Sequence, residues 1–126
     1  MRVLLVDDNE AMLARARTVL TSHCAIVAAV RDGPAALAMA AVLRPDVIIL
    51  DISLPGMTGF EIARRLRQAG SAAAIVFLTI HEAEEFVLAA RNAGGIGYVL
   101  KLRMVSDLVP AVLDARAGRP FVSKPH

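Results

Sequence analysis

The stretch Val47-Ile48-Ile49-Leu50-Asp51 is a run of four aliphatic residues that ends in an acid. A short apolar run without alternating polar residues is typical of a parallel strand that is covered on both faces. Four further runs share this character, so the expected strands are residues 3–6, 25–30, 47–50, 74–78 and 97–100. Longer stretches with helical spacing of their apolar residues separate these runs. The alternation predicts a parallel sheet with helices on both faces and right-handed crossovers.

The expected fold is α/β: a doubly wound, five-stranded parallel sheet with strand order 2-1-3-4-5, the flavodoxin-like (βα)5 arrangement. In that order, ligands bind at the carboxyl ends of the strands, near the switch point between strands 1 and 3. Gly118 follows the last helical pattern. We therefore expect one domain over residues 1–118, and residues 119–126 as a C-terminal tail or the start of a linker.

Local signals predict several helix boundaries. Gly33, which precedes a proline, is expected to begin the second helix. Thr58 and Glu61 have the spacing of a capping box, in which each side chain satisfies a free amide at the start of the third helix. If Asp107 caps the fifth helix, Pro110 stands at the third helical position, where its missing N–H costs nothing.

Composition limits the class of protein. The chain has 126 residues, of which 56% are hydrophobic and 21% charged, and this balance excludes a disordered chain. A net charge of +2 and an aromatic content of 4% do not predict nucleic-acid binding. The single cysteine excludes an internal disulfide and fits a reducing compartment. No apolar run approaches the ~20 residues of a membrane span, and no signal peptide precedes the first strand, so we expect a cytoplasmic protein without membrane contact.

Polar residues follow four of the expected strands. Asp7 and Asp8 end the first strand, Asp51 the third, Thr79 the fourth and Lys101 the fifth. Each alone has a simpler explanation, such as a helix cap, a turn or a solvated strand end. Together, three carboxylates at one sheet edge repel one another unless a positive charge lies between them. A hard cation such as Mg²⁺ fits this set of oxygen ligands, and with Lys101 it would form a site for a phosphoryl group.

The ordered set of these residues resembles the response-regulator receiver domain of two-component signalling, over residues 2 to about 118. An acidic pair alone is a weak signal, whereas the whole set in this order is specific. The residues that carry the resemblance are Asp7-Asp8, Asp51 with Leu54-Pro55-Gly56-Met57-Thr58-Gly59, Thr79, and Gly97-Tyr98-Val99-Leu100-Lys101.

The resemblance implies a set of roles at the site. Asp51 would be the phosphoacceptor and would take a phosphoryl group from a histidine of a sensor kinase, forming an acyl phosphate. Asp8 would bind Mg²⁺ directly and Asp7 mostly through water, with the backbone carbonyl of Ser53 as a third protein ligand. Lys101 would pair with the phosphoryl oxygens. The domain would not be an enzyme in the ordinary sense, although it would promote its own phosphoryl transfer and slow dephosphorylation.

The resemblance also implies a switch and a partner. Thr79 would donate its hydroxyl to the phosphoryl group and move toward it, and Tyr98 would turn inward to fill the vacated space. This change would alter the surface of the fourth helix, fifth strand and fifth helix. An effector domain of the same protein, or a second receiver in a homodimer, would read that surface.

Further details resemble the NarL/LuxR-type regulators, in which a receiver precedes a helix-turn-helix domain. They are residues 79–82, residues 93–101, the ending at residues 118–123, and Leu102 in place of a proline after Lys101. The expected output is therefore regulation of transcription. No helix-turn-helix fits into residues 119–126, so this chain is not expected to bind DNA itself.

Three alternatives compete with this assignment. A stand-alone or degenerate receiver would act as a protein–protein interaction module. A flavodoxin-like binder would need a Gly- or Ser-rich loop after the first strand, where acids stand instead. A phosphatase with an aspartate nucleophile would need a second acid at the position of Ser53. Two departures from common receivers, Ile80 and Ser53, predict slow self-dephosphorylation.

Overall fold

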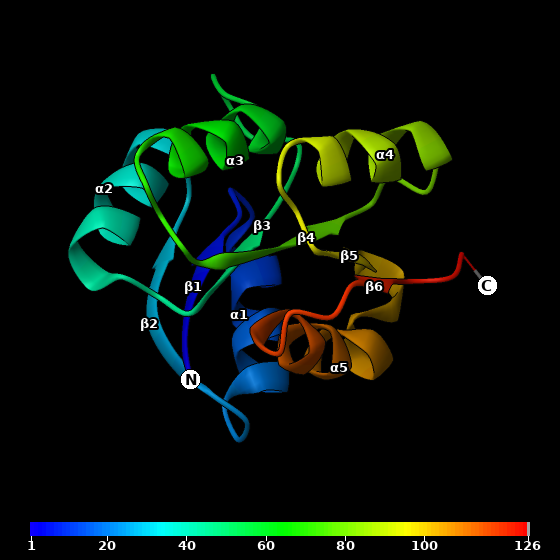
Figure 1. Cartoon of the computed structure of the whole chain (residues 1–126). Helices are drawn as coiled ribbons and strands as arrows, with labels where there is room; N and C mark the ends of the chain where they lie inside the picture. The colour runs from blue at the N-terminus through cyan, green and yellow to red at the C-terminus, as the bar shows by residue number, and fades with distance from the viewer. Residues whose placement is uncertain (126) are drawn as a thin grey trace.

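The computed structural model of the chain describes residues 1–125, which form one sheet between two layers of helices (Figure 1). All six strands are parallel, in the order β2-β1-β3-β4-β5-β6. Within these residues, none of the helices combines the length and apolar character that crossing a bilayer takes. The elements are β1 (Arg2–Val6), α1 (Glu10–Leu20), β2 (Ala25–Val30), α2 (Gly33–Leu43), β3 (Val47–Leu50), α3 (Gly59–Gln68), β4 (Ala74–Thr79), α4 (Glu84–Asn92), β5 (Gly97–Leu100), the 3-10 turn η1 (Lys101–Arg103), α5 (Met104–Arg116) and β6 (Phe121–Val122).

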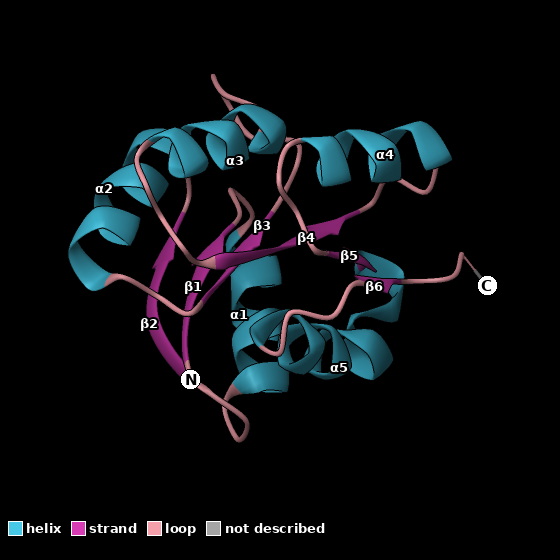
Figure 2. Ribbon diagram, in the orientation of Figure 1, coloured by secondary structure: helices cyan, strands magenta, loops and turns pink. Residues whose placement is uncertain are grey.

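The sheet separates two apolar cores, with α2, α3 and α4 on one face and α1 and α5 on the other (Figure 2). Alternate residues of each central strand enter opposite cores, so that Ile48 and Leu50 pack toward α2 and α3 while Val47 and Ile49 pack toward α1 and α5. Because both sets are buried, these strands read as unbroken apolar runs. The predicted fold class is confirmed.

The start of α5 differs from the prediction. The helix begins at Met104, directly after η1, so Asp107 is not its cap. Pro110 is the seventh residue of the helix rather than the third. Its ring removes the donor that would reach the carbonyl of Ser106, and both residues are exposed, so water can hydrate that carbonyl. At α3, Glu61 N donates to Thr58 Oγ1 at 3.2 Å, but the Glu61 carboxylate pairs with Arg65 instead of completing the capping box.

The strand count is the main correction to the predicted fold. Residues 121–123 were expected to leave the domain, and instead Phe121–Val122 form β6 and pair with β5. Phe121 N donates to Ile96 O at 3.2 Å, and Ser123 N donates to Tyr98 O at 2.8 Å. The predicted order 2-1-3-4-5 is thus extended by one edge strand. The domain boundary at residue 118 stays a prediction, and residue 126 of the expected tail lies outside the described residues.

Candidate functional site

Three acids meet where β1 and β3 end. The two strands pair with Val6 opposite Leu50, so that Asp7 and Asp51, the next residues of each strand, are brought side by side. Asp51 N donates to Val6 O at 3.0 Å and fixes this arrangement. Carboxylate oxygens of Asp7, Asp8 and Asp51 all lie within 4.8 Å of one another. The first and last are buried, whereas Asp8 is exposed.

Lys101 reaches these acids from the end of β5. Its Nζ lies 2.9 Å from Asp7 Oδ2 and 3.2 Å from Asp51 Oδ2. Burial alone would lower the pKa of Lys101, but the two carboxylates outweigh it and raise that pKa, so the ammonium stays charged. Burial, with the neighbouring Asp7 charge, raises the pKa of Asp51 despite the attraction of Lys101.

The remaining contacts of the acids leave room for a cation. Asp7 Oδ1 accepts from Asn9 N at 2.9 Å, and Asp51 Oδ1 accepts from Ile52 N at 2.8 Å. Among residues 1–125, Asp7 Oδ2 is a buried oxygen that accepts no hydrogen bond, although it lies beside Lys101. Three carboxylates thus face one ammonium. The oxygen donors, their spacing and the uncompensated charge fit Mg²⁺.

The two predicted switch residues lie beside this site and share one neighbour, His81. Thr79 ends β4 and is fully buried, and its Oγ1 accepts from His81 N at 3.2 Å. Tyr98 is buried in β5, and its hydroxyl donates to His81 O at 2.8 Å. The ring therefore points inward in this structure, and burial raises the pKa of Tyr98 to about 12.

His81 is a residue to which sequence reasoning gave no role. Its Nε2 lies 3.0 Å from Ser53 Oγ, and its ring stacks on Phe86 with centroids 4.1 Å apart and planes 6° apart. It thereby joins the loop after β3 to α4. The sequence includes it only within the segment 79–82, and two of its contacts use backbone atoms, which a residue type does not predict.

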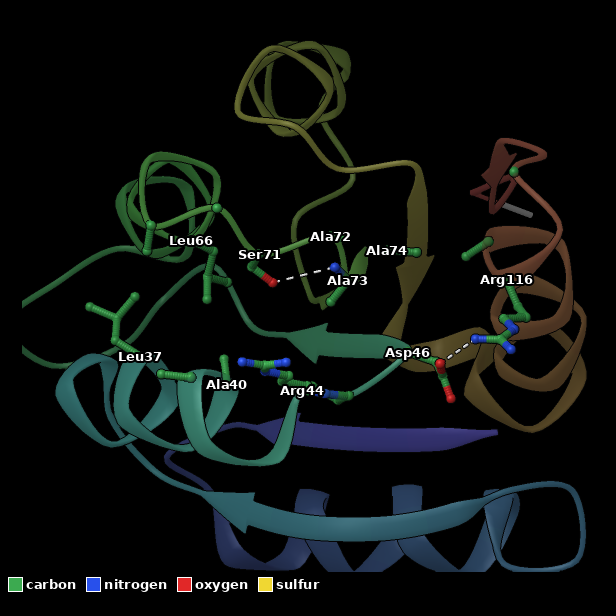
Figure 3. A pocket seen from close by; sticks show the side chains of 16 residues that line it. Leu37, Ala40, Arg44, Asp46, Leu66, Ser71, Ala72, Ala73, Ala74 and Arg116 are labelled. Carbon is green, nitrogen blue, oxygen red and sulfur yellow. Dashed lines mark hydrogen bonds and ion pairs between the residues drawn. The ribbon is translucent and has the colours of Figure 1, made fainter.

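A groove of about 770 Å³ lies at the opposite edge of the sheet (Figure 3). Its walls come from the last turns of α2 and α5, from the segment after α3, and from residues just before β3 and β4. Small residues such as Ala40 and Ala73 line it, and its charged groups are Arg44 and the Asp46–Arg116 ion pair. None of the predicted site residues lines this groove.

The raised pKa of Asp51 predicts a pH-dependent stability. The folded protein holds the Asp51 proton more tightly than the unfolded chain, so this carboxyl favours folding at acid pH and loses that contribution as pH rises through its folded-state pKa. Asp51→Asn has no carboxyl at this position, so it does not lose stability in this way as pH rises. We expect its melting temperature to exceed that of the wild type at neutral pH, with the difference narrowing as the solution is acidified. Thermal scans over this range test it, with exposed Asp8→Asn as the control. A difference that is constant with pH would contradict the assignment.

Comparisons with known proteins identify the family of this chain. The family model of the response regulator receiver domain matches residues 3–113. The nitrate/nitrite response regulator protein NarP of Escherichia coli (strain K12) is 37% identical over 125 residues, 98% of this chain and 58% of its own length. NarL of the same organism is 31% identical over 124 residues, 97% of this chain and 57% of its own length.

Among solved structures, a two-component response regulator of the LuxR family from Aurantimonas sp. SI85-9A1 matches with a TM-score of 0.92 and 34% identity, covering 98% of this chain and 89% of that one. The chain spans somewhat more than half of the length of NarP and NarL. These relatives also confirm the resemblance to NarL/LuxR-type regulators. The matched residues include every acid of the site together with Thr79, Tyr98 and Lys101, and the chain belongs to the response regulator receiver domain family.

Proposed function

We propose that this receiver is a switch that is phosphorylated on Asp51 by a sensor histidine kinase. A carboxylate oxygen of Asp51 attacks the phosphorus of a phosphohistidine, the P–N bond breaks, and the imidazole nitrogen keeps its electron pair. The observation that carries the proposal is the position of Asp51, a buried carboxylate that contacts the Lys101 ammonium and lies beside the carboxylates of Asp7 and Asp8.

Each neighbour of Asp51 has a part in this transfer. Mg²⁺ would be held by Asp7, Asp8, Asp51 and the backbone carbonyl of Ser53. When it is bound, the ion would neutralise charge on the phosphoryl oxygens. Lys101 is already within 3.2 Å of Asp51 Oδ2 and can shift onto the incoming oxygens. Its compact ammonium can pair with a phosphoryl oxygen without a fixed fork geometry.

His81 connects the two switch residues, Thr79 and Tyr98. When Thr79 turns its hydroxyl toward the phosphoryl group, it gives up the hydrogen bond from His81 N. Tyr98 holds the other side of the same residue through His81 O, so the inward ring and the β4–α4 loop move as one unit. The surface formed by α4, β5 and α5 then changes. A DNA-binding effector domain or a second receiver would bind that surface. The protein would act in the cytoplasm, and its output would be regulation of transcription.

A phosphorylation assay with acetyl phosphate and Mg²⁺ tests the proposal. We expect one phosphoryl group per chain by phosphate-affinity electrophoresis and intact-mass measurement. Asp51→Asn should abolish it, and Asp8→Ala should abolish it while the circular dichroism spectrum is unchanged. Modification that persists in Asp51→Asn would overturn the proposed acceptor. An unmodified wild type would favour the second candidate, a degenerate receiver that acts as an interaction module.

Ile80 is expected to slow the loss of the phosphoryl group. It directly follows Thr79 and is 69% exposed, so it is not buried against α4. Attack by water needs an open approach in line with the bond that breaks. Ile80→Ala should therefore speed dephosphorylation severalfold, where each tenfold step corresponds to about 1.4 kcal/mol of barrier.

The control for this prediction is Val42→Ala, which also truncates an exposed apolar side chain, 73% exposed, on the remote helix α2. Both variants should unfold at the wild-type denaturant concentration, because neither side chain is buried. Decay of the phosphorylated proteins is followed after acetyl phosphate is removed. Equal decay rates for Ile80→Ala and the wild type would exclude a gating role.

A further inference from the structure

A buried polar network joins the C-terminal strand to the site, and its centre is Ser123. This residue is only 6% exposed. Its hydroxyl donates to Asp107 Oδ2 at 2.7 Å and accepts from Leu100 N at 3.2 Å, and its own amide donates to Tyr98 O at 2.8 Å. The single donor of this hydroxyl and one of its two acceptor lone pairs are therefore hydrogen-bonded. Residues 121–123 are thus fixed by side chains as well as by strand pairing.

Asp107 is the charged part of the network. It is 9% exposed and accepts from Ser106 Oγ at 2.9 Å and from Arg103 Nε at 3.1 Å, in addition to Ser123. Burial acts to raise the pKa of Asp107, but these three donors outweigh it and lower that pKa, so the carboxylate stays ionised. A charged acceptor strengthens each of the hydrogen bonds it receives.

The network contacts residues on both sides of Lys101 in the sequence. Leu100, held by Ser123, precedes Lys101, and Arg103, held by Asp107, ends the 3-10 turn that begins with Lys101. These contacts fix the backbone from which the lysine side chain extends to Asp7 and Asp51. If Ser123 detaches from β5, the amide of the buried residue Leu100 loses the hydroxyl that accepts its hydrogen bond. Leaving this buried amide without an acceptor costs free energy.

We propose that Ser123 and Asp107 are positioning residues for Lys101, and that docking of residues 121–123 on β5 is coupled to phosphoryl chemistry at Asp51. The proposal rests on the proposed function, because the coupling partner is the phosphorylated aspartate. When residues 121–123 are docked, the Lys101 ammonium is held where it can contact the phosphoryl oxygens. By reciprocity, a phosphoryl group that binds the correctly placed lysine tightens the docked strand. The edge strand thereby links the state of Asp51 to the C-terminal end of the chain.

The first arm of the test measures the rate of phosphorylation by acetyl phosphate with saturating Mg²⁺. We expect Ser123→Ala and Asp107→Asn to be phosphorylated about 5-fold or more slowly, the lower end of typical coupling between sites. Ser123→Thr keeps the hydroxyl and should recover most of the rate. The matched control is Ser106→Ala, which removes a donor to the same carboxylate but no contact with Leu100. A wild-type rate in Ser123→Ala, with Ser106→Ala and the wild type normally phosphorylated, would overturn the inference and leave the proposed function intact.

The second arm measures amide hydrogen exchange and needs no phosphorylation. In Ser123→Ala, exchange should rise at residues 100–103 and 121–123 and stay unchanged in α2 and α3. A uniform rise over the chain would mean only a loss of stability and would overturn a positioning role. In the wild type, beryllofluoride with Mg²⁺, which mimics a phosphoryl group, should slow exchange at residues 121–123. If the wild type is never phosphorylated, the proposed function fails, and unchanged exchange at residues 100–103 in Ser123→Ala would reject the positioning role separately.

Discussion

Lys101→Met is expected to lower the free energy of unfolding by about 3 kcal/mol at neutral pH, because removing one partner of a buried ion pair leaves the other charge uncompensated. Two buried carboxylates, Asp7 and Asp51, depend on this one ammonium, at 2.9 and 3.2 Å. Methionine keeps the apolar length of the side chain, so the change isolates the charge. Urea denaturation monitored by circular dichroism measures the effect.

The pH dependence and a control identify the cause. Without the ammonium, protonation of the two carboxyls relieves their repulsion, so the deficit of Lys101→Met should shrink as pH falls. Added Mg²⁺ should recover part of it at neutral pH, since a cation that binds only the folded state stabilises it. Lys124→Met replaces an exposed lysine and should change little. A deficit that is the same at neutral and acid pH would mean that lost packing, not charge, is responsible.

Gly59→Ala is expected to cost about 3 kcal/mol or more, at or above the upper end of typical overpacking penalties. Gly59 is the first residue of α3, and its amide donates to Ile52 O at 2.8 Å. A Cβ at this position would overlap the backbone oxygen of Asp51 and stand 2.9 Å from the Cα of Ile52. Backbone atoms cannot swing aside as a side chain can, so α3 or the loop that carries Asp51 must move.

This displacement should also impair phosphorylation, since Asp51 itself would shift. Gly33→Ala is the matched control, because it too places a methyl group on the first residue of a helix. There the nearest atom is Met57 Sδ at 2.9 Å, the end of a flexible side chain that can rotate away. Denaturant unfolding and acetyl phosphate labelling compare the two variants. Equal stabilities would mean that α3 moves away from Asp51 at no cost in free energy.

The five predicted strands lie within one residue of those observed. An unbroken apolar run such as Ile75 to Leu78 is typical of a central parallel strand, whose two faces are both buried. The acids were predictable for the same reason: each directly follows such a run, and topology brings the strand ends together. Of the predicted site residues, Asp7, Asp51 and Lys101 are in direct contact, Asp8 is exposed beside them, and Thr79 and Tyr98 meet at His81.

What could not be predicted depends on contacts between distant residues. β6 has only two residues and follows Pro120, so it has no periodicity of its own and forms because β5 offers an edge. The interpretation of Asp107 as a helix cap rests on its distance from Pro110, and it misses the partner Ser123, which lies 16 residues away. His81 is joined to Ser53 and Tyr98 across 28 and 17 residues. A local pattern carries no information about such partners.

β6 also covers part of the edge of β5 that would otherwise be open to another molecule. The edge of a sheet presents free N–H and C=O groups on which a strand of another molecule can add. Here β6 occupies that position beside β5, and it is only two residues long. Pro120, directly before it, has no amide hydrogen to donate to a neighbour. A receiver fragment that ends at Gly118 would instead expose the edge of Gly97–Leu100, and it would form intermolecular sheets more readily than the whole chain.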